Sequence, residues 1–351
     1  MGARVNTVVS FQFSVVRLIA VQMLLLAFFF TGCTPDEEED RRSPDTTPAV
    51  VLPPAPQFDP DSAYTFIEKQ VAFGPRVPGS AAHEACGDWL VAQLKTNGAT
   101  VIEQRDSVIA FNNRKMPLRN IIGSWKPEAK ERILLFAHWD TRPFADRDDD
   151  RKHEPIDGAN DGGSGVGVLL EIARHLSDQA SGSRPELGID ILFTDMEDHG
   201  EPSGSMTLDE KSIDTWALGA QYFAKNPHVP NYKARFGILL DMVGAHDAKF
   251  YQEALSMQYA PAIVRKVWRT AHAIGFGDRF VQETKYFVGI DDHVPINKQL
   301  RIPSIDIIQY DPSTNAFGPF WHTHDDNMDV ISKETLKAVG QTVMEVVWKE
   351  R

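Results

Sequence analysis

Three apolar segments of this chain end in acidic residues or in a histidine, and this feature constrains the fold most. The segments and their polar ends are residues 132–137 with His138 and Asp140, residues 188–194 with Glu197 and Asp198, and residues 235–240 with Asp241. Short apolar runs of this length are typical of strands buried on both faces of a parallel sheet. Because parallel strands end at the same edge of a sheet, these polar side chains are expected to converge there.

Helical patterns alternate with the apolar segments. We expect helices at 61–72, 80–95, 164–176, 216–225, 256–274 and 332–348, and further strands at 100–111, 117–125 and 302–310. Ser164 is the predicted N-cap of the helix at 164–176. The alternation predicts an α/β fold, a three-layer sandwich with a central mixed, largely parallel twisted sheet flanked by helices.

The first 60 residues are not expected to belong to this fold. Residues 1–32 carry an apolar run of the length of a signal peptide and end before Cys33, which resembles a bacterial lipoprotein signal with Cys33 as the lipidated residue. The alternative is an uncleaved N-terminal anchor helix. Residues 33–60, with seven prolines and an acidic cluster, predict a disordered tether to the domain at 61–351.

These segments place the expected protein in the bacterial cell envelope, bound to a membrane through a lipid anchor and facing the periplasm or the outer surface. The formal net charge is −13, and removal of Arg4 and Arg17 with the signal makes it −15. An acidic surface of this size argues against nucleic acid as a partner.

Carboxylates and imidazoles at one sheet edge are suited to a catalytic zinc ion, which takes three protein ligands and keeps one position open. Asp161, Asp198 and His322 are the candidate ligands, and His138 and Asp241 would be available for a second ion.

Glu197 lies beside a candidate ligand and is the candidate general base. Alternatives stay open for single residues: Asp161 could serve a turn in "NDGG", and His138 could be a hydrogen-bonded core histidine. The charged run at 146–155 is expected to be a solvated loop.

Six sequence blocks resemble one enzyme family when they are read in order. They are "AHWDTRPFAD", "GANDGGSGVGVLLEIAR", "LFTDMED", "GILLDMVGA", "IDDHVPI" and "FWHTHDDNMDVI". Their order is similar to that in the zinc-dependent M28 peptidase family, and more closely to its glutaminyl cyclase branch. The resemblance covers residues 61–348 and implies a zinc aminopeptidase-like fold.

The resemblance implies a role for each matching residue. Asp161, Asp198 and His322 match the zinc ligands, although the family usually has Glu at position 198. Glu197 matches the catalytic acid/base.

Two further carboxylates, Asp241 and Asp291, match a network hydrogen-bonded to that acid/base. Trp321 matches the aromatic wall of the substrate pocket. One zinc ion is expected in this branch, and a second would use His138 and Asp241.

The implied reaction converts the N-terminal Gln of peptides or proteins to pyroglutamate with release of ammonia. The main rival is a di-zinc aminopeptidase of the same family, in which the same base would activate water. A rival of another class is a surface lipoprotein that binds peptides without catalysis.

Overall fold

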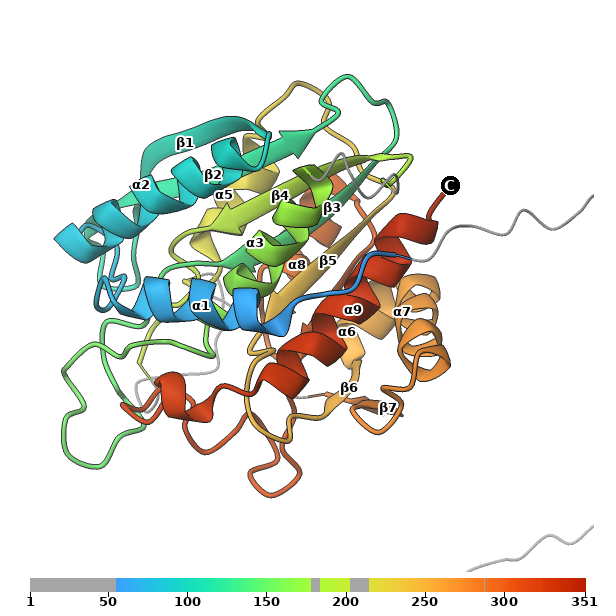
Figure 1. Ribbon diagram of the computed structural model, residues 1–351. Coiled ribbons are helices and arrows are strands. Elements are labelled where there is room, and N and C mark those ends of the chain that lie inside the picture. The colour runs from blue at the N-terminus through green and yellow to red at the C-terminus, as the bar shows by residue number, and fades with distance from the viewer. Residues whose placement is uncertain (1–54, 178–183, 203–214, 287) are drawn as a thin grey trace, which may run out of the picture. The chain divides into compact units, whose positions relative to one another are not determined.

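A six-stranded sheet forms the centre of the protein, which we describe from a computed structural model (Figure 1). Its strands are β1 (Thr100–Ile109), β2 (Lys115–Trp125), β3 (Arg132–His138), β4 (Gly188–Thr194), β5 (Phe236–Asp241) and β8 (Ser304–Ile308). They lie side by side in the order β1-β2-β4-β3-β5-β8. Strands β4, β3, β5 and β8 are parallel, whereas β1 and β2 add an antiparallel edge. The predicted mixed, largely parallel sheet is confirmed.

The structure describes residues 55–177, 184–202, 215–286 and 288–351. The predicted signal segment at 1–32, Cys33 and most of the predicted tether at 33–60 lie outside these ranges. Within them, no helix is both long enough and apolar enough to cross a membrane.

Helices cover both faces of the sheet, which confirms the three layers. They are α1 (Pro60–Val71), α2 (Ala81–Thr96), α3 (Gly163–Ser177), α5 (Leu218–Lys225), α6 (Ala254–Tyr259), α7 (Pro261–Ala273), α8 (His293–Pro295) and α9 (Lys333–Lys349), with a π-helix at Ile296–Leu300 and a 3-10 helix at Met328–Val330. Figure 1 shows α1, α3 and α9 in front of the sheet and α5 and α8 behind it.

The alternation of side chains along β3 explains why both faces need a cover. Ile133 and Leu135 belong to the large core that also contains residues of α1, α3 and α9. Leu134 and Phe136 point the other way, into a smaller core with Phe223 of α5. Each fully buried side chain of this kind contributes about 1.5–3 kcal/mol. A strand with apolar residues on both faces is stable only between two helical layers.

The register of the parallel strands brings their carboxyl ends together. His138 at the end of β3 pairs with Thr194 at the end of β4, and β5, the neighbour of β3 on its other side, ends at Asp241. The chain segments that follow these three ends therefore lie at one edge of the sheet.

Two local expectations were wrong. Ser164 is not an N-cap: it lies inside α3, where its hydroxyl donates to the Asn160 carbonyl (2.6 Å) and accepts from the Val243 N–H (2.9 Å). The helix expected at 256–274 is broken into α6 and α7 at Ala260, because the following Pro261 begins a new helix at its N-terminal position.

The short parallel pair β6 (Phe250–Glu253) and β7 (Phe280–Lys285) had not been expected.

Candidate metal and catalytic site

A tight turn after β4 presents the two adjacent acids Glu197 and Asp198. Met196 adopts a left-handed conformation (φ 58°), which is uncommon for a residue other than glycine. The backbone N–H groups of Glu197 and Asp198 then donate to the two oxygens of Asp140, at 3.1 and 3.2 Å. The Asp140 carboxylate thus fixes the backbone of the turn. The side chains of Glu197 and Asp198 remain available for other contacts.

Asp161, Asp198 and His322 come together at this turn from three separate segments. Nε2 of His322 lies 3.2 Å from Oδ1 of Asp198 and 3.7 Å from Oδ2 of Asp161, and all three residues are buried. Tetrahedral zinc binds N and O ligands at about 2.0–2.2 Å, which places its ligand atoms about 3.4 Å apart. The spacing of this group therefore fits a zinc ion.

The hydrogen bonding of Asp198 also fits a cation. Asp198 is 1% exposed, yet neither of its side-chain oxygens accepts a hydrogen bond from any described residue. Burial and the nearby Asp161 raise the pKa of Asp198. A buried carboxylate without donors is costly unless a charge compensates it. A divalent cation between the three side chains would supply that charge.

His322 is held in place by residues that the sequence analysis did not single out. Its Nδ1 lies 3.2 Å from Asp146, and its own backbone is left-handed (φ 58°). Arg142 donates to both oxygens of Asp146 (2.8 and 3.0 Å) and to the carbonyl of Asp198 (2.9 Å). Burial alone would raise the pKa of Asp146, but hydrogen bonds from His322 and Arg142 lower it. The expectation of a solvated loop at 146–155 is therefore wrong at its first residue.

Asp161 is not an exposed turn residue, because it is 4% exposed. Asp326 accepts the backbone N–H groups of Asn160 and Asp161 at 2.7 and 3.0 Å and so fixes this segment. Burial and the Asp161 carboxylate raise the pKa of Asp326 to about 7.

A second group of possible ligands surrounds His138. Its Nε2 lies 3.0 Å from Oδ1 of Asp161 and 3.2 Å from Oδ1 of Asp241. Burial would lower the pKa of His138, but hydrogen bonds to Asp140, Asp161 and Asp241 raise it well above its usual value. A protonated His138 thus compensates these carboxylates. The group at Asp198 differs in that both oxygens of Asp198 lack a hydrogen bond from any described residue.

Several buried carboxyl groups surround Glu197. Burial, followed by repulsion from Asp291 and Asp198, raises the pKa of Glu197 well above its usual value. Burial likewise raises the pKa of Asp241 to about 7 and the pKa of Asp291. Clustered carboxyl groups with raised pKa values are typical of sites that transfer protons.

Asp306 on β8 belongs to the same cluster, and burial next to Asp291 and Asp241 raises its pKa well above the usual value. The sequence offered a signal for it, namely a single acid inside the apolar strand "PSIDII".

Aromatic rings line the side of the group formed by Asp161, Asp198 and His322. The ring centroid of Trp321 lies 4.0 Å from that of His322, and Phe317 packs edge-on against Trp321 at 4.6 Å. Trp216, which the sequence analysis missed, lies parallel to His322 at 6.1 Å and stacks on Arg142. The predicted wall residue Trp321 is therefore next to His322, and only half-buried.

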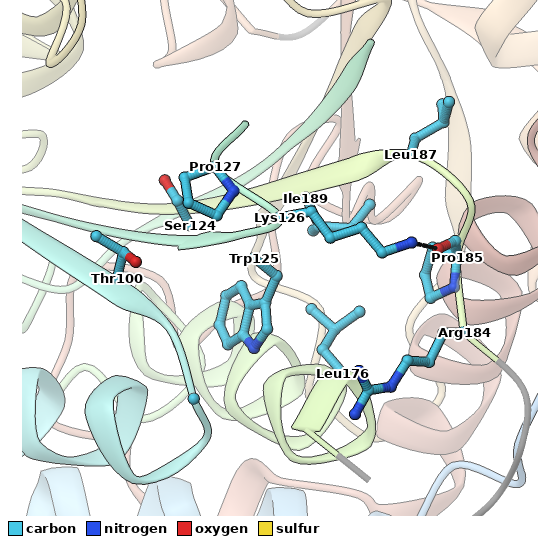
Figure 2. Close-up of a pocket in the computed structure, with 11 residues that line it drawn as sticks. Thr100, Ser124, Trp125, Lys126, Pro127, Leu176, Arg184, Pro185, Leu187 and Ile189 are labelled. Atoms are coloured by element: carbon cyan, nitrogen blue, oxygen red, sulfur yellow. Dashed lines mark hydrogen bonds between the residues drawn. The ribbon is translucent and has the colours of Figure 1, made fainter. Parts of the chain in front are cut away.

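A separate cavity of about 180 Å³ lies at the opposite end of the strands, near the start of β4 (Figure 2). Its lining includes Trp125, Leu176 and Leu187, and Lys126 donates to the Pro185 carbonyl at 2.6 Å. None of its lining residues is an acid, a histidine or a cysteine. This cavity therefore offers none of the acid or imidazole side chains that gather at the carboxyl ends of the strands.

Comparison with known proteins places this arrangement among zinc enzymes. Residues 120–347, more than half of the chain, match the model of peptidase family M28. The structure is similar to that of Bacteroides thetaiotaomicron glutaminyl cyclase bound to N-acetylhistamine, with a TM-score of 0.81 and 52% identity over 85% of this chain and 100% of that chain.

It is also similar to a Zn-dependent exopeptidase from Parabacteroides distasonis, with a TM-score of 0.80 and 50% identity over 84% of this chain and 100% of that chain. Among curated proteins, aminopeptidase YwaD of Bacillus subtilis is 28% identical over 300 residues, which are 82% of this chain. The chain spans only 56% of the length of that relative.

Proposed function

This chain belongs to peptidase family M28, and on that premise we propose that it is a zinc-dependent glutaminyl-peptide cyclotransferase. Its substrates are peptides or proteins with an N-terminal Gln, and its products are the pyroglutamyl peptide and ammonia. The 52% identity to a glutaminyl cyclase that the chain covers in full supports this choice within the family.

One observation carries the proposal, the difference between the two groups of possible metal ligands. Both buried oxygens of Asp198 lack a hydrogen bond from any described residue, with only His322 (3.2 Å) and Arg142 (3.6 Å) near Oδ1. His138, by contrast, is hydrogen-bonded to Asp241 and lies 3.0 Å from Asp161. We therefore propose a single zinc ion, held by Asp161, Asp198 and His322. With one ion, His138, Asp161 and Asp241 remain in contact with one another through His138.

When bound, zinc would act as a Lewis acid on the side-chain amide of the substrate glutamine. Asp198 replaces the Glu that the family more often has, so its shorter side chain must be brought closer to the ion. Arg142, bonded to the carbonyl of Asp198 at 2.9 Å, is placed to fix that approach.

Glu197 moves the proton in this proposal. The α-amine nitrogen of the substrate attacks its own side-chain amide carbon, and Glu197 accepts a proton from that nitrogen. The carbon–nitrogen bond of the amide then breaks, and Glu197 returns the proton to the departing ammonia. A base with a raised pKa is suited to both halves of this transfer near neutral pH.

Asp291 and Asp241 support Glu197 in this scheme. Because neighbouring buried carboxyl groups do not all ionise, the raised pKa of Asp291 favours a protonated group that can donate a hydrogen bond near the reacting centre. Trp321 forms the wall against which the glutamine side chain packs.

A second candidate function is removal of the N-terminal residue by a di-zinc aminopeptidase. The group of His138, Asp161 and Asp241 favours it, because the three could hold a second ion. In that case Glu197 would activate a water molecule and the peptide bond would be cleaved.

One assay separates the candidates. Purified zinc-loaded protein is incubated with a peptide that begins with Gln, and the products are followed by mass spectrometry. Loss of one ammonia from an otherwise intact peptide is expected. Release of free Gln would refute the cyclase in favour of the aminopeptidase, and an unchanged peptide would favour a binding protein.

We also propose that the chain is a lipoprotein of the bacterial cell envelope, anchored through Cys33 and facing the periplasm or the outer surface. Support comes from residues 1–33 of the sequence alone. Incorporation of a labelled fatty acid into the expressed protein is expected, and Cys33→Ser should abolish it. Equal labelling of both proteins would contradict the anchor.

A further inference from the structure

Arg147 is an exposed arginine at the edge of the site, and its guanidinium group has no ion-pair partner in the part of the chain that the structure describes. It lies in an acidic stretch, yet no carboxylate among the described residues pairs with it. The two neighbouring acids are already engaged, Asp146 with Arg142 and His322, and Asp148 with His324.

The backbone on both sides of Arg147 is fixed to the segment that carries His322. The N–H of Arg147 donates to the His322 carbonyl at 3.2 Å, and Asp148 accepts from the N–H of His324 at 3.1 Å. The side chain is fixed as well, because the guanidinium lies 4.2 Å from the centre of the Trp321 ring. Arg147 is therefore not a freely moving surface charge.

The position of Trp321 decides what the guanidinium can meet. The centroid of its ring lies 4.0 Å from the ring centroid of His322 and 4.2 Å from the guanidinium carbon of Arg147. A substrate whose first residue packs against Trp321, as proposed above, would have its following residues close to this wall. The N–H donors of Arg147, which lies against the same ring, would then be within reach of the second or third residue of the peptide.

A guanidinium group with free donors binds carboxylates in a planar, bidentate geometry. We propose that Arg147 is a specificity-determining residue, which recognises a carboxylate one or two residues after the N-terminal Gln. This carboxylate is either an acidic side chain or the C-terminus of a short peptide. The inference rests on the proposed cyclotransferase function and adds a substrate class to it.

The test compares peptides that differ only in this charge. One pair is Gln-Glu-Ala-amide and Gln-Gln-Ala-amide, and the other is Gln-Ala with a free carboxylate and Gln-Ala-amide. Ammonia release gives kcat and KM for each. The acidic member of at least one pair should have a kcat/KM about threefold to fivefold higher, as expected for a partly exposed ion pair.

Two variants distinguish a specific contact of Arg147 from the effect of the overall charge of its loop. Arg147→Gln should reduce the ratio to about one, mainly through KM, because the contact is remote from the reacting atoms. Arg151→Gln is the matched control: it lies in the same loop, is exposed, and pairs with Glu154 rather than with the site. That variant should keep the wild-type ratio.

Three results would overturn the inference while leaving the cyclase intact. They are an unchanged ratio in Arg147→Gln, an equal loss of kcat/KM for all four peptides, and the same fall of the ratio in Arg151→Gln. Failure of the wild-type protein to release ammonia from any peptide would instead refute the proposed function, and the inference with it. If only the second pair responds, the C-terminal carboxylate is the group recognised.

Discussion

Two buried aspartates in the same part of the chain, Asp190 within β4 and Asp198 just after it, show opposite solutions to the burial of a charge. Asp190 accepts four hydrogen bonds: two from Arg132 (2.6 and 2.7 Å), one from Ser124 (2.6 Å) and one from Tyr232 (2.8 Å). Asp198 is buried to a similar degree, yet its oxygens accept none from the described residues.

The difference separates a structural acid from a functional one. Burial alone does not distinguish them, since both are almost inaccessible to water. What differs is the supply of donors within the fold, because a carboxylate that the fold has already neutralised has no capacity left for a ligand. The unsatisfied end of this strand is therefore where a metal ion is expected.

The largest effect should come from Glu197→Gln. The amide cannot accept the proton, so kcat should fall about 10²- to 10⁴-fold. Zinc content, measured by elemental analysis, and the melting temperature should stay at wild-type values. Loss of zinc in this variant would mean that the roles of Glu197 and Asp198 are exchanged.

Asp198→Ala tests the unsatisfied acid directly. Zinc affinity, measured by competition with a chelator, should fall about 100-fold or more, because removal of a ligand costs more than removal of a residue that only orients one. The metal-free protein should lose less stability than it does in Asp190→Ala, since the Asp198 side chain accepts no hydrogen bond from the described residues and has only the looser ion pairs with His322 (3.2 Å) and Arg142 (3.6 Å). A wild-type zinc affinity would refute the ligand role.

Asp190→Ala is the matching change at the satisfied end. It leaves the buried Arg132 without its partner, so the free energy of unfolding should fall by about 3–5 kcal/mol in urea titration. The zinc affinity of the folded fraction should be unchanged. Equal destabilisation by Asp190→Ala and Asp198→Ala in metal-free protein would break the comparison.

Asp146→Asn tests how far the support of the site extends. Loss of the carboxylate beside Nδ1 of His322 should weaken zinc binding about 10- to 100-fold. Asp148→Asn is the control, because Asp148 contacts His324 instead. Identical zinc affinities of the two variants would show that Asp146 does not orient His322.

The smallest effect concerns pH. The pKa of Asp326 is raised to about 7, so the folded metal-free protein binds a proton there that the unfolded chain releases above about pH 4. This contribution to the free energy of unfolding is present below pH 4 and is lost as the pH rises to 7. From pH 5 to pH 7 the loss should be about 2 kcal/mol. Urea titrations of wild type and Asp326→Asn should differ in this slope, and parallel curves would contradict the raised pKa.

The sequence was sufficient for features that depend on local patterns. The strands β3, β4 and β5 follow from apolar runs, and the convergence of His138, Glu197 and Asp241 follows from their position after those runs. The alternation with helices then determines the layers, because a sheet that is apolar on both faces needs two covers.

The residues that the sequence did not reveal depend on the path of loops. Arg142 and Asp146 contact Asp198 and His322 only because the loop after β3 folds back over the site. Trp216 precedes a helix without any pattern that marks it. The break between α6 and α7, by contrast, was predictable, because Pro261 is a clear signal for the end of one helix and the start of another. The prediction of one long helix did not take this proline into account.

The proposed metal ligands Asp161, Asp198 and His322 are spread over nearly half of the chain. During synthesis the ribosome adds His322 only after all six strands of the sheet have been made, and α9, which follows it, completes the large core with α1 and α3. Until then the growing chain carries the carboxylates without the imidazole that completes their set. On the proposed ligand set, zinc can be held only after His322 has been added, and a fragment that lacks the final thirty residues should retain none.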